Sequence, residues 1–375
     1  MASAKKKTKK QSPELTSNPS LPYDLVLTCF ARVSRLYYPT TLSLVSKSCR
    51  SLIASPELYK TRSLLNHKES CLYVCLEFSS DPNQRWFTLC RKPNQTLTNK
   101  SSVYALVPVP VPSSPPVNSN RLVTVGSNIY IFSRCNENAP SSSVSIVDCR
   151  SHTRHEAPRM RMKRSHPAVN VVDGKIYVAG GLEMEDSKSS NWMEVFDPKT
   201  QSWELVCSPL DMRCCSIHKS FVIEGKIYLF GGKDMAYKPK EDKWIAITEE
   251  NLYYILGRSW LSYRVIDNVI YCWNRQDGIM WYDSEVRYWI KLKGLEGLPT
   301  FAGYSSVRLV DHGGKLVVLW DKYVPASRYK VKVIWCAVIS LEKRNSEKVL
   351  GKVEWFDVVL TVPKSQFLCA ISATV

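Results

Sequence analysis

The sequence Asp173-Gly-Lys-Ile-Tyr-Val-Ala-Gly-Gly181 returns 51 residues later as Glu224-Gly-Lys-Ile-Tyr-Leu-Phe-Gly-Gly232, and this recurrence constrains the fold more than any other feature. A single glycine-rich stretch behind an apolar run could hold a phosphate at the start of a helix. A stretch that recurs instead indicates a structural unit. Similar β-branched and aromatic runs occur in four more places, so the chain has six anchor positions. They are Tyr73, Tyr130, Tyr177, Tyr228, Tyr271 and Val317, separated by 57, 47, 51, 43 and 46 residues.

A second landmark follows three of these runs: an aromatic residue stands seven positions before a tryptophan. The pairs are Phe196 and Trp203, Tyr237 and Trp244, and Tyr282 and Trp289. Turn-forming residues fill the space between them, which predicts a hairpin with one aromatic residue on each arm. Val147 and Arg154 fit the same frame, with arginine in place of tryptophan.

Short strands repeated every 40–50 residues predict a mainly β fold, a β-propeller. Six anchors imply six blades, and five is the alternative because the units at Tyr130, Tyr271 and Val317 lack the double glycine. We expect the tryptophans to fill the wedges between blades. Residues 365–375 read as a strand that joins the first blade, near Cys71, and closes the ring. Residues 107–116, Val-Pro-Val-Pro-Val-Pro-Ser-Ser-Pro-Pro, are expected to form an extended loop between units.

The first 65 residues differ from the rest. Residues 1–20 are polar and basic and are expected to be disordered. Residues 21–65 show apolar positions at helical spacing, with Pro22 suited to a first helical turn. The sequence Ser55-Pro56-Glu57 predicts an N-cap, a proline at the first helical position and an acidic first turn. We therefore divide the chain into a basic tail (1–20), a small helical module (21–65) and a propeller (70–375).

Charge and composition limit the function classes. The formal net charge is +17, to which five lysines in the first ten residues contribute, but no nucleic-acid-binding motif accompanies it. No apolar stretch is long enough to span a membrane. The thirteen cysteines show no zinc spacing and mostly lie in apolar runs, as in reduced cytoplasmic or nuclear proteins. His152 and His155 lack further ligands, and no catalytic or nucleotide-binding motif occurs. We predict no metal, no cofactor and no catalytic residue.

The propeller region and the helical module each resemble a known type of module. Apolar strand, double glycine, aromatic residue and spaced tryptophan resemble the kelch repeat of β-propellers. Leu21-Pro22, Val45-Ser-Lys47, Arg50-x-Leu52-Ile53 and Ser55-Pro56 resemble an F-box, although Cys49 departs from the large aromatic residue usual there. Together they resemble the plant F-box/kelch-repeat family.

That resemblance implies a partner and an activity. The F-box would bind a Skp-family adaptor of a cullin-RING ubiquitin ligase, and the propeller would hold the protein to be ubiquitinated; the alternative is an interaction scaffold without ubiquitination. The F-box residues shared between its own core and the adaptor surface would be Leu21, Pro22, Leu25, Phe30, Val33, Leu44, Val45 and Ile53.

The resemblance also implies a substrate-binding face on the propeller, formed by the loops after the glycine pairs and the loops leading into the next innermost strand. The first set of loops would present Arg134, Asn136, Glu183, Lys233, Asp234, Asn274 and Arg275. The second set would present Arg164, His166, Arg213 and Arg258. Because arginine binds carboxylates and phosphates, an acidic or phosphorylated partner is a hypothesis, and a solvated basic rim is the alternative.

Overall fold

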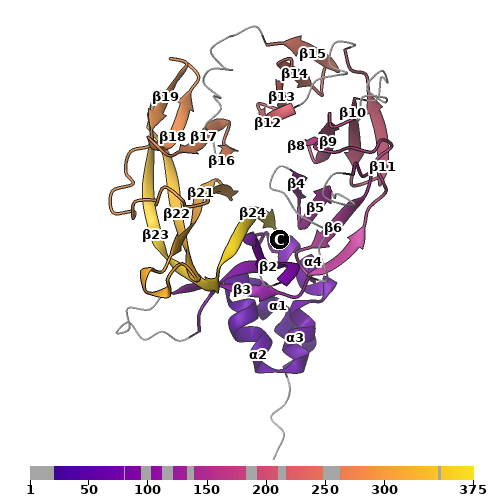
Figure 1. The fold of residues 1–375 in the computed structure, drawn as a ribbon. Coiled ribbons are helices and arrows are strands. Elements are labelled where there is room, and N and C mark those ends of the chain that lie inside the picture. Colours follow the sequence, from indigo (N-terminus) through magenta and orange to yellow (C-terminus); the bar gives the residue numbers. More distant parts are fainter. Residues whose placement is uncertain are drawn as a thin grey trace, which may run out of the picture.

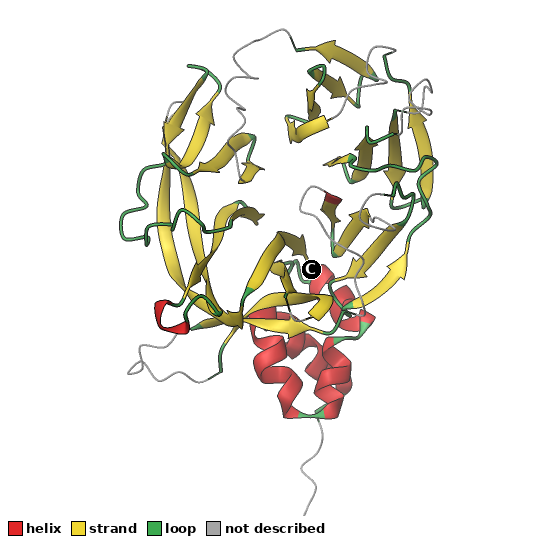
Figure 2. Ribbon diagram, viewed as in Figure 1, coloured by secondary structure: helices red, strands yellow, loops and turns green. Residues whose placement is uncertain are grey.

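Six four-stranded antiparallel sheets stand in a ring around a central axis in the computed structural model, with a group of short helices at one side (Figure 1; Figure 2). The structure describes residues 21–79, 81–93, 103–111, 121–132, 139–182, 192–209, 217–247, 262–344 and 348–375. The predicted six-bladed propeller is thereby confirmed, and the five-bladed alternative is wrong.

Each blade is numbered here by its place in the ring, and its strands are given from the axis outward. Blade 1 contains β24 (Ser365–Thr374), β1 (Ser70–Phe78), β2 (Asp81–Arg91) and β3 (Tyr104–Val109). Blade 2 contains β4 (Leu122–Val125), β5 (Asn128–Phe132), β6 (Val144–Asp148) and β7 (Thr153–Glu156). Blade 3 contains β8 (Ala168–Val172), β9 (Lys175–Ala179), β10 (Met193–Asp197) and β11 (Ser202–Val206).

The other three blades follow the same order. Blade 4 contains β12 (Ile217–Ile223), β13 (Lys226–Gly231), β14 (Met235–Lys238) and β15 (Lys243–Ala246). Blade 5 contains β16 (Ser262–Ile266), β17 (Val269–Asn274), β18 (Gly278–Asp283) and β19 (Tyr288–Lys291). Blade 6 contains β20 (Val307–His312), β21 (Lys315–Tyr323), β22 (Val331–Arg344) and β23 (Lys348–Pro363).

The ring closes by pairing strands from opposite ends of the propeller sequence. Strand β24 pairs antiparallel with β1, from Ser70 opposite Thr374 to Phe78 opposite Ser365. The innermost strand of the first blade is thus supplied by the segment that follows blade 6. This confirms the predicted role of residues 365–375, and it leaves the first blade without a free inner edge.

The wedges between blades are filled by the aromatic pairs that the sequence singles out. Phe196 lies opposite Trp203 in the β10–β11 hairpin, with ring centroids 4.9 Å apart, and both pack against apolar residues of blade 2. The indole N–H of Trp203 donates to the Pro158 carbonyl at 2.9 Å, and that of Trp244 donates to the Cys207 carbonyl at 2.7 Å. Each tryptophan therefore binds the segment that leaves the preceding blade, which fixes the stacking of successive blades.

The double glycine of blade 3 is required by close packing. Gly180 and Gly181 both have positive φ, +70° and +71°. A Cβ at Gly181 would stand 2.9 Å from the His166 main-chain nitrogen, and one at Gly180 would stand 2.9 Å from the Ile217 side chain. These glycines serve the blade and form no phosphate-binding loop.

The proline-rich segment corrects one expectation. Val107, Pro108 and Val109 form part of β3, with Pro108 opposite Phe87. The strand is the outermost one of blade 1, where a residue without an N–H is tolerated. The prediction of a loop is therefore wrong for these three residues. Residues 112–116 lie outside the described part.

The helical module contains α1 (Tyr23–Arg32), η1 (Arg35–Tyr37), η2 (Tyr38–Leu42), α2 (Ser43–Val45), α3 (Lys47–Ile53) and α4 (Pro56–Leu64). Helix α4 begins as the sequence predicts: the Ser55 hydroxyl accepts from the Leu58 N–H at 3.3 Å, and Pro56 takes the first helical position. A small core of Ala31, Tyr38 and Leu58 holds the helices together. Figure 1 shows α4 against the propeller and α2 and α3 at the far end.

Candidate functional site

The far end of the helical module exposes a cluster of apolar side chains. Leu44 and Val45 in α2 are 69% and 68% exposed, and Leu21 and Leu25 at the start of α1 are 66% and 54% exposed. Pro22 is exposed beside them. Five of the eight residues predicted for the adaptor surface thus have accessible side chains. Exposed apolar patches of this kind are typical of interaction surfaces.

The remaining three predicted residues lie elsewhere. Phe30, Val33 and Ile53 are partly buried and pack against the core of Ala31, Tyr38 and Leu58. They support the helices that carry the exposed cluster, so the predicted set divides between core and surface.

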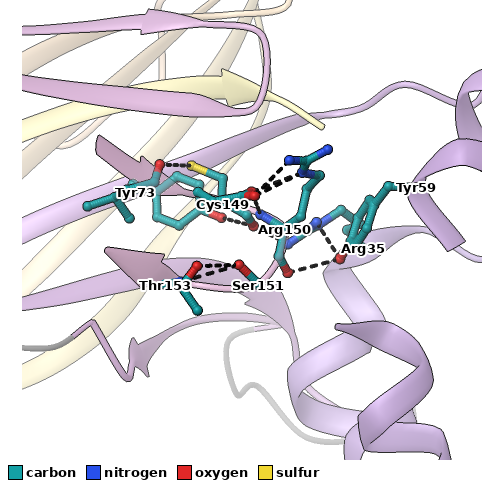
Figure 3. A network of polar contacts seen from close by, with 9 residues as sticks. Arg35, Tyr59, Tyr73, Cys149, Arg150, Ser151 and Thr153 are labelled. Atoms are coloured by element: carbon teal, nitrogen blue, oxygen red, sulfur yellow. Dashed lines mark hydrogen bonds and ion pairs between the residues drawn. The ribbon is translucent and has the colours of Figure 1, made fainter. Parts of the chain in front are cut away.

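The helical module is fixed to the propeller by Arg35, which lies just after α1 (Figure 3). Its Nη1 donates to the Tyr59 hydroxyl and its Nη2 donates to the Cys149 carbonyl, both at 2.8 Å. The Tyr73 hydroxyl of β1 donates to the same carbonyl at 3.0 Å, and that of Tyr59 contacts the Arg150 carbonyl at 3.2 Å. Arg35 therefore joins α4, blade 1 and the β6–β7 turn of blade 2.

A second buried arginine completes this junction. The Arg62 side chain is 2% exposed and donates to the Glu69 carboxylate at 2.9 Å, while its Nη1 donates to the main-chain carbonyls of Ala31 and Val33. Burial and the neighbouring Arg35 charge lower the pKa of His152, which contacts the Tyr73 hydroxyl, to about 4. The junction therefore contains a neutral histidine and two arginines whose charges are held by hydrogen bonds and an ion pair. These contacts hold the helical module rigidly against the propeller.

A channel of 1170 Å³ runs through the ring and is lined by the innermost strand of every blade. These strands run in the same direction around the axis. Arg308 near the start of β20 donates to the Phe367 carbonyl near the start of β24, and His312 at the end of β20 contacts Ser372 near the end of β24. The channel therefore has two distinct mouths, one where the innermost strands begin and one where they end.

The helical module lies on the side where the innermost strands end. It binds the β6–β7 turn through Cys149 and Arg150, and the Cys149 N–H donates to Ser127 in the turn after β4. The loops predicted to bind a substrate connect β13 to β14, β17 to β18, and each outermost strand to the next innermost strand. They lie at the opposite ends of the strands from the turns that the helical module contacts. The exposed apolar cluster, at the far end of that module, therefore lies away from the predicted binding loops (Figure 1).

The largest difference from the sequence-based expectation is Arg164. Its guanidinium group is fully buried and donates to Glu194 Oε1 at 2.8 Å and to the Gly180 carbonyl at 2.7 Å. The desolvation of this group lowers its pKa in spite of the Glu194 charge. Placing Arg164 on the accessible face is therefore wrong: the residue precedes an innermost strand, but its side chain turns inward and holds blade 3.

The other predicted face residues have mixed positions. His166 lines the channel mouth. Lys233 and Arg275 are exposed in the β13–β14 and β17–β18 loops. Asp234 accepts from the Gly231 N–H at 3.0 Å and Asn274 accepts from the Asp277 N–H at 2.6 Å, so both shape their own turns. Arg134, Asn136, Glu183, Arg213 and Arg258 lie outside the described residues.

Sequence reasoning missed the cations inside the channel. Arg121, Lys219, Arg264 and Arg308 line it, each at or next to an innermost strand. Each of these cations lies at or next to the strand that precedes the anchor strand of its unit. This repeated position in the sequence is the signal that could have found them.

The metal-ligating side chains and the buried thiols of the described residues bear on chemical reactivity. No group of three or more metal-ligating side chains occurs among them. Burial raises the pKa of the Cys90 and Cys272 thiols to about 12, which leaves them protonated and unreactive. No helix within the described ranges is long and apolar enough to cross a membrane.

Comparison with known proteins agrees with this architecture. Residues 86–360 match the FKB95 kelch-repeats domain, and residues 19–61 match the F-box domain. The chain belongs to the F-box/kelch-repeat family. F-box/kelch-repeat protein At5g49000 of Arabidopsis thaliana is 58% identical over 382 residues and 100% of both chains. F-box/kelch-repeat protein At4g39550 of the same plant is 54% identical over 393 residues, covering 99% of this chain and 98% of its own length.

Membership in the family bears on both the helical module and the propeller. F-box domains bind Skp1-type adaptors, and kelch propellers are protein-interaction domains. F-box/kelch proteins are generally adaptors without catalytic activity, and the combination found here is of the substrate-adaptor type. The exposed cluster of Leu21, Pro22, Leu25, Leu44 and Val45 lies within the matched F-box and is called the F-box apolar surface below.

Proposed function

We propose that this chain is the substrate-recognition subunit of an SCF-type ubiquitin ligase. The F-box apolar surface binds a Skp-family adaptor, and the propeller binds the protein to be ubiquitinated. The observation that carries the proposal is the position of that surface, at the far end of the F-box and away from the predicted binding loops. The adaptor and a substrate can therefore bind together.

The rigid junction supports the same proposal. Transfer of ubiquitin needs a substrate held at a set position relative to the adaptor. Arg35 donates to the Cys149 carbonyl of blade 2, and Arg62 pairs with Glu69 just before blade 1, so both arginines connect the F-box to the propeller. A flexible tether between the modules would not set that position.

Co-purification tests the adaptor contact. The full chain, co-expressed with a Skp-family adaptor, is expected to form a stable complex. In Leu44→Asp/Val45→Asp the complex is expected to be lost, because two charges would be buried against the adaptor. Leu64→Asp is the matched control: Leu64 is 78% exposed in α4 but lies outside the F-box apolar surface.

The same variants identify substrates. With an intact fold, Leu44→Asp/Val45→Asp should retain proteins on the propeller without ubiquitinating them, so they accumulate relative to the unmodified chain. If the unmodified, folded chain does not bind the adaptor, the proposal is wrong, and the interaction scaffold without ubiquitination takes its place.

A further inference from the structure

The cations that line the central channel are arranged unevenly along its axis. Arg121 immediately precedes β4, Lys219 is near the start of β12 and Arg308 is near the start of β20. Asp311 lies toward the end of β20, and Asp267 follows β16. Positive charge thus gathers at the mouth opposite the F-box, and the two lining carboxylates stand toward the other mouth.

His166 and His218 line the same positive mouth. Arg264, in the middle of β16, adds a fourth permanent or near-permanent cation to the lumen. Walls of low dielectric constant focus the field of such a cluster into the water between them.

Two of the arginines form no direct ion pair in the described ranges: the carboxylates of Asp311 and Asp321 act on Arg264 and Arg308 only at longer range. Arg264 Nε donates to the Leu309 carbonyl at 3.1 Å, and Arg308 Nη2 donates to the Phe367 carbonyl at 2.9 Å. Neither guanidinium group forms an ion pair with any residue in the described ranges. Nε of Arg308 is buried without a hydrogen-bond partner there. Partly desolvated charge of this kind gains free energy when an anion arrives.

The pKa values of the channel cations also favour the binding of an anion. Burial lowers the pKa of Lys219 to about 8 and lowers the pKa of both Arg264 and Arg308. An anion in the lumen would offset this effect, because it stabilises the charged form of each group.

We propose that the positive mouth of the channel binds a small, multiply charged anion of the phosphate type. The lumen has room for a compound of small-molecule size. Guanidinium and ammonium groups on several blades match an anion with several charged oxygens, whereas chloride would engage them one at a time. Because the anion contacts innermost strands of different blades, it also ties those blades together and stabilises the ring.

Calorimetric titration of the full chain with sodium tripolyphosphate tests the site, with sodium chloride at matched ionic strength as the reference. We expect saturable 1:1 binding of tripolyphosphate and a rise in the melting temperature, neither of which chloride produces. Lys219→Gln and Arg308→Gln should each weaken binding about 10-fold, the effect of one charge-assisted contact. Lys322→Gln removes the same charge from an exposed position on blade 6 outside the channel and should leave the affinity unchanged.

The outcomes separate the site from its alternatives. Arg308→Gln also alters the contact with Phe367, so its fold is checked by circular dichroism, and Lys219→Gln provides an independent measurement. Equal affinities for Lys219→Gln, Lys322→Gln and the unmodified chain would overturn the proposal, as would no binding of tripolyphosphate. Binding of a phosphorylated peptide but not of free tripolyphosphate would also overturn it, in favour of a protein ligand.

Discussion

Arg62 and Glu69 form an ion pair across the boundary between the F-box and the propeller, with Arg62 Nη2 2.9 Å from Glu69 Oε2. The same carboxylate oxygen accepts a hydrogen bond from the main-chain N–H of Arg35 at 2.8 Å. Glu69 also exchanges two main-chain hydrogen bonds with Val375, beside the closing strand β24. One glutamate therefore connects the F-box, the start of blade 1 and the end of the strand that closes the ring.

Glu69→Ala is expected to destabilise the chain and to loosen the F-box. The change leaves the buried Arg62 charge unpaired, which costs about 1–3 kcal/mol after allowance for the partly exposed partner. Urea unfolding gives the stability, and tryptic cleavage at the exposed Lys68 reports the local opening. Glu57→Ala, an exposed glutamate of α4, is the control. Unchanged stability together with unchanged cleavage at Lys68 would contradict the prediction.

Replacing Glu194 by alanine should destabilise blade 3 strongly. The Arg164 and Glu194 side chains are both fully buried, and an unpaired guanidinium there costs about 3–5 kcal/mol. Chemical denaturation measures the loss. The paired change Arg164→Met/Glu194→Met should recover most of it, because no charge is left buried. A single variant as stable as the paired one would show that the ion pair is not what holds this blade.

Stability should fall on mild acidification because of two histidines. Burial lowers the pKa of His152 and His312 from 6.5 to about 4. Between these values the unfolded chain binds more protons than the folded chain, so the stabilisation is complete above about pH 6.5 and is lost as the pH falls toward 4. At pH 5 the loss is at most ~2 kcal/mol per histidine.

Urea midpoints at pH 7 and pH 5 check this dependence. His312→Asn can keep a hydrogen bond to Ser372 without a titrating group, so its midpoint should depend less on pH than that of the unmodified chain. His67→Asn, at an exposed position, should keep the full dependence. Equal pH dependence in all three proteins would refute the assignment to His312.

Removal of residues 365–375 should abolish cooperative folding of the propeller. Without β24 the inner edge of β1 is unpaired and the channel loses one wall. We expect aggregation or a broad, non-cooperative transition, measured by light scattering and thermal unfolding. Adding the eleven residues back as a separate peptide should restore part of the monomer. A truncated chain that stays monomeric with an unchanged midpoint would contradict the closure described above.

Much of the fold could be read from local patterns. The aromatic–tryptophan spacing fixes a hairpin, and hairpins repeated at 43–57 residues fix a ring of blades. The capping sequence Ser55-Pro56-Glu57 places the start of α4 because its determinants lie within four residues. Such features depend on neighbours in the sequence, and for that reason they were predictable.

The site was harder to predict because its contacts join distant segments. Arg164 looked like a surface residue from its loop position, since its partner Glu194 stands in a different strand of the blade. The junction at Arg35 depends on Cys149, more than a hundred residues later. The channel cations become neighbours only when the ring closes, so their repeated place before the anchors does not by itself show that they share one channel.

The pairing of β1 with β24 also sets an order of events during synthesis. Strand β1 leaves the ribosome before five other blades exist, and its inner partner follows all of them. Throughout that interval the first blade, which is also the platform for the F-box, remains an open sheet. The propeller can therefore complete its native fold only after β24 has been synthesised and has paired with β1. A chain interrupted anywhere within the propeller therefore lacks the strand that closes the ring, and we expect it to be incompletely folded.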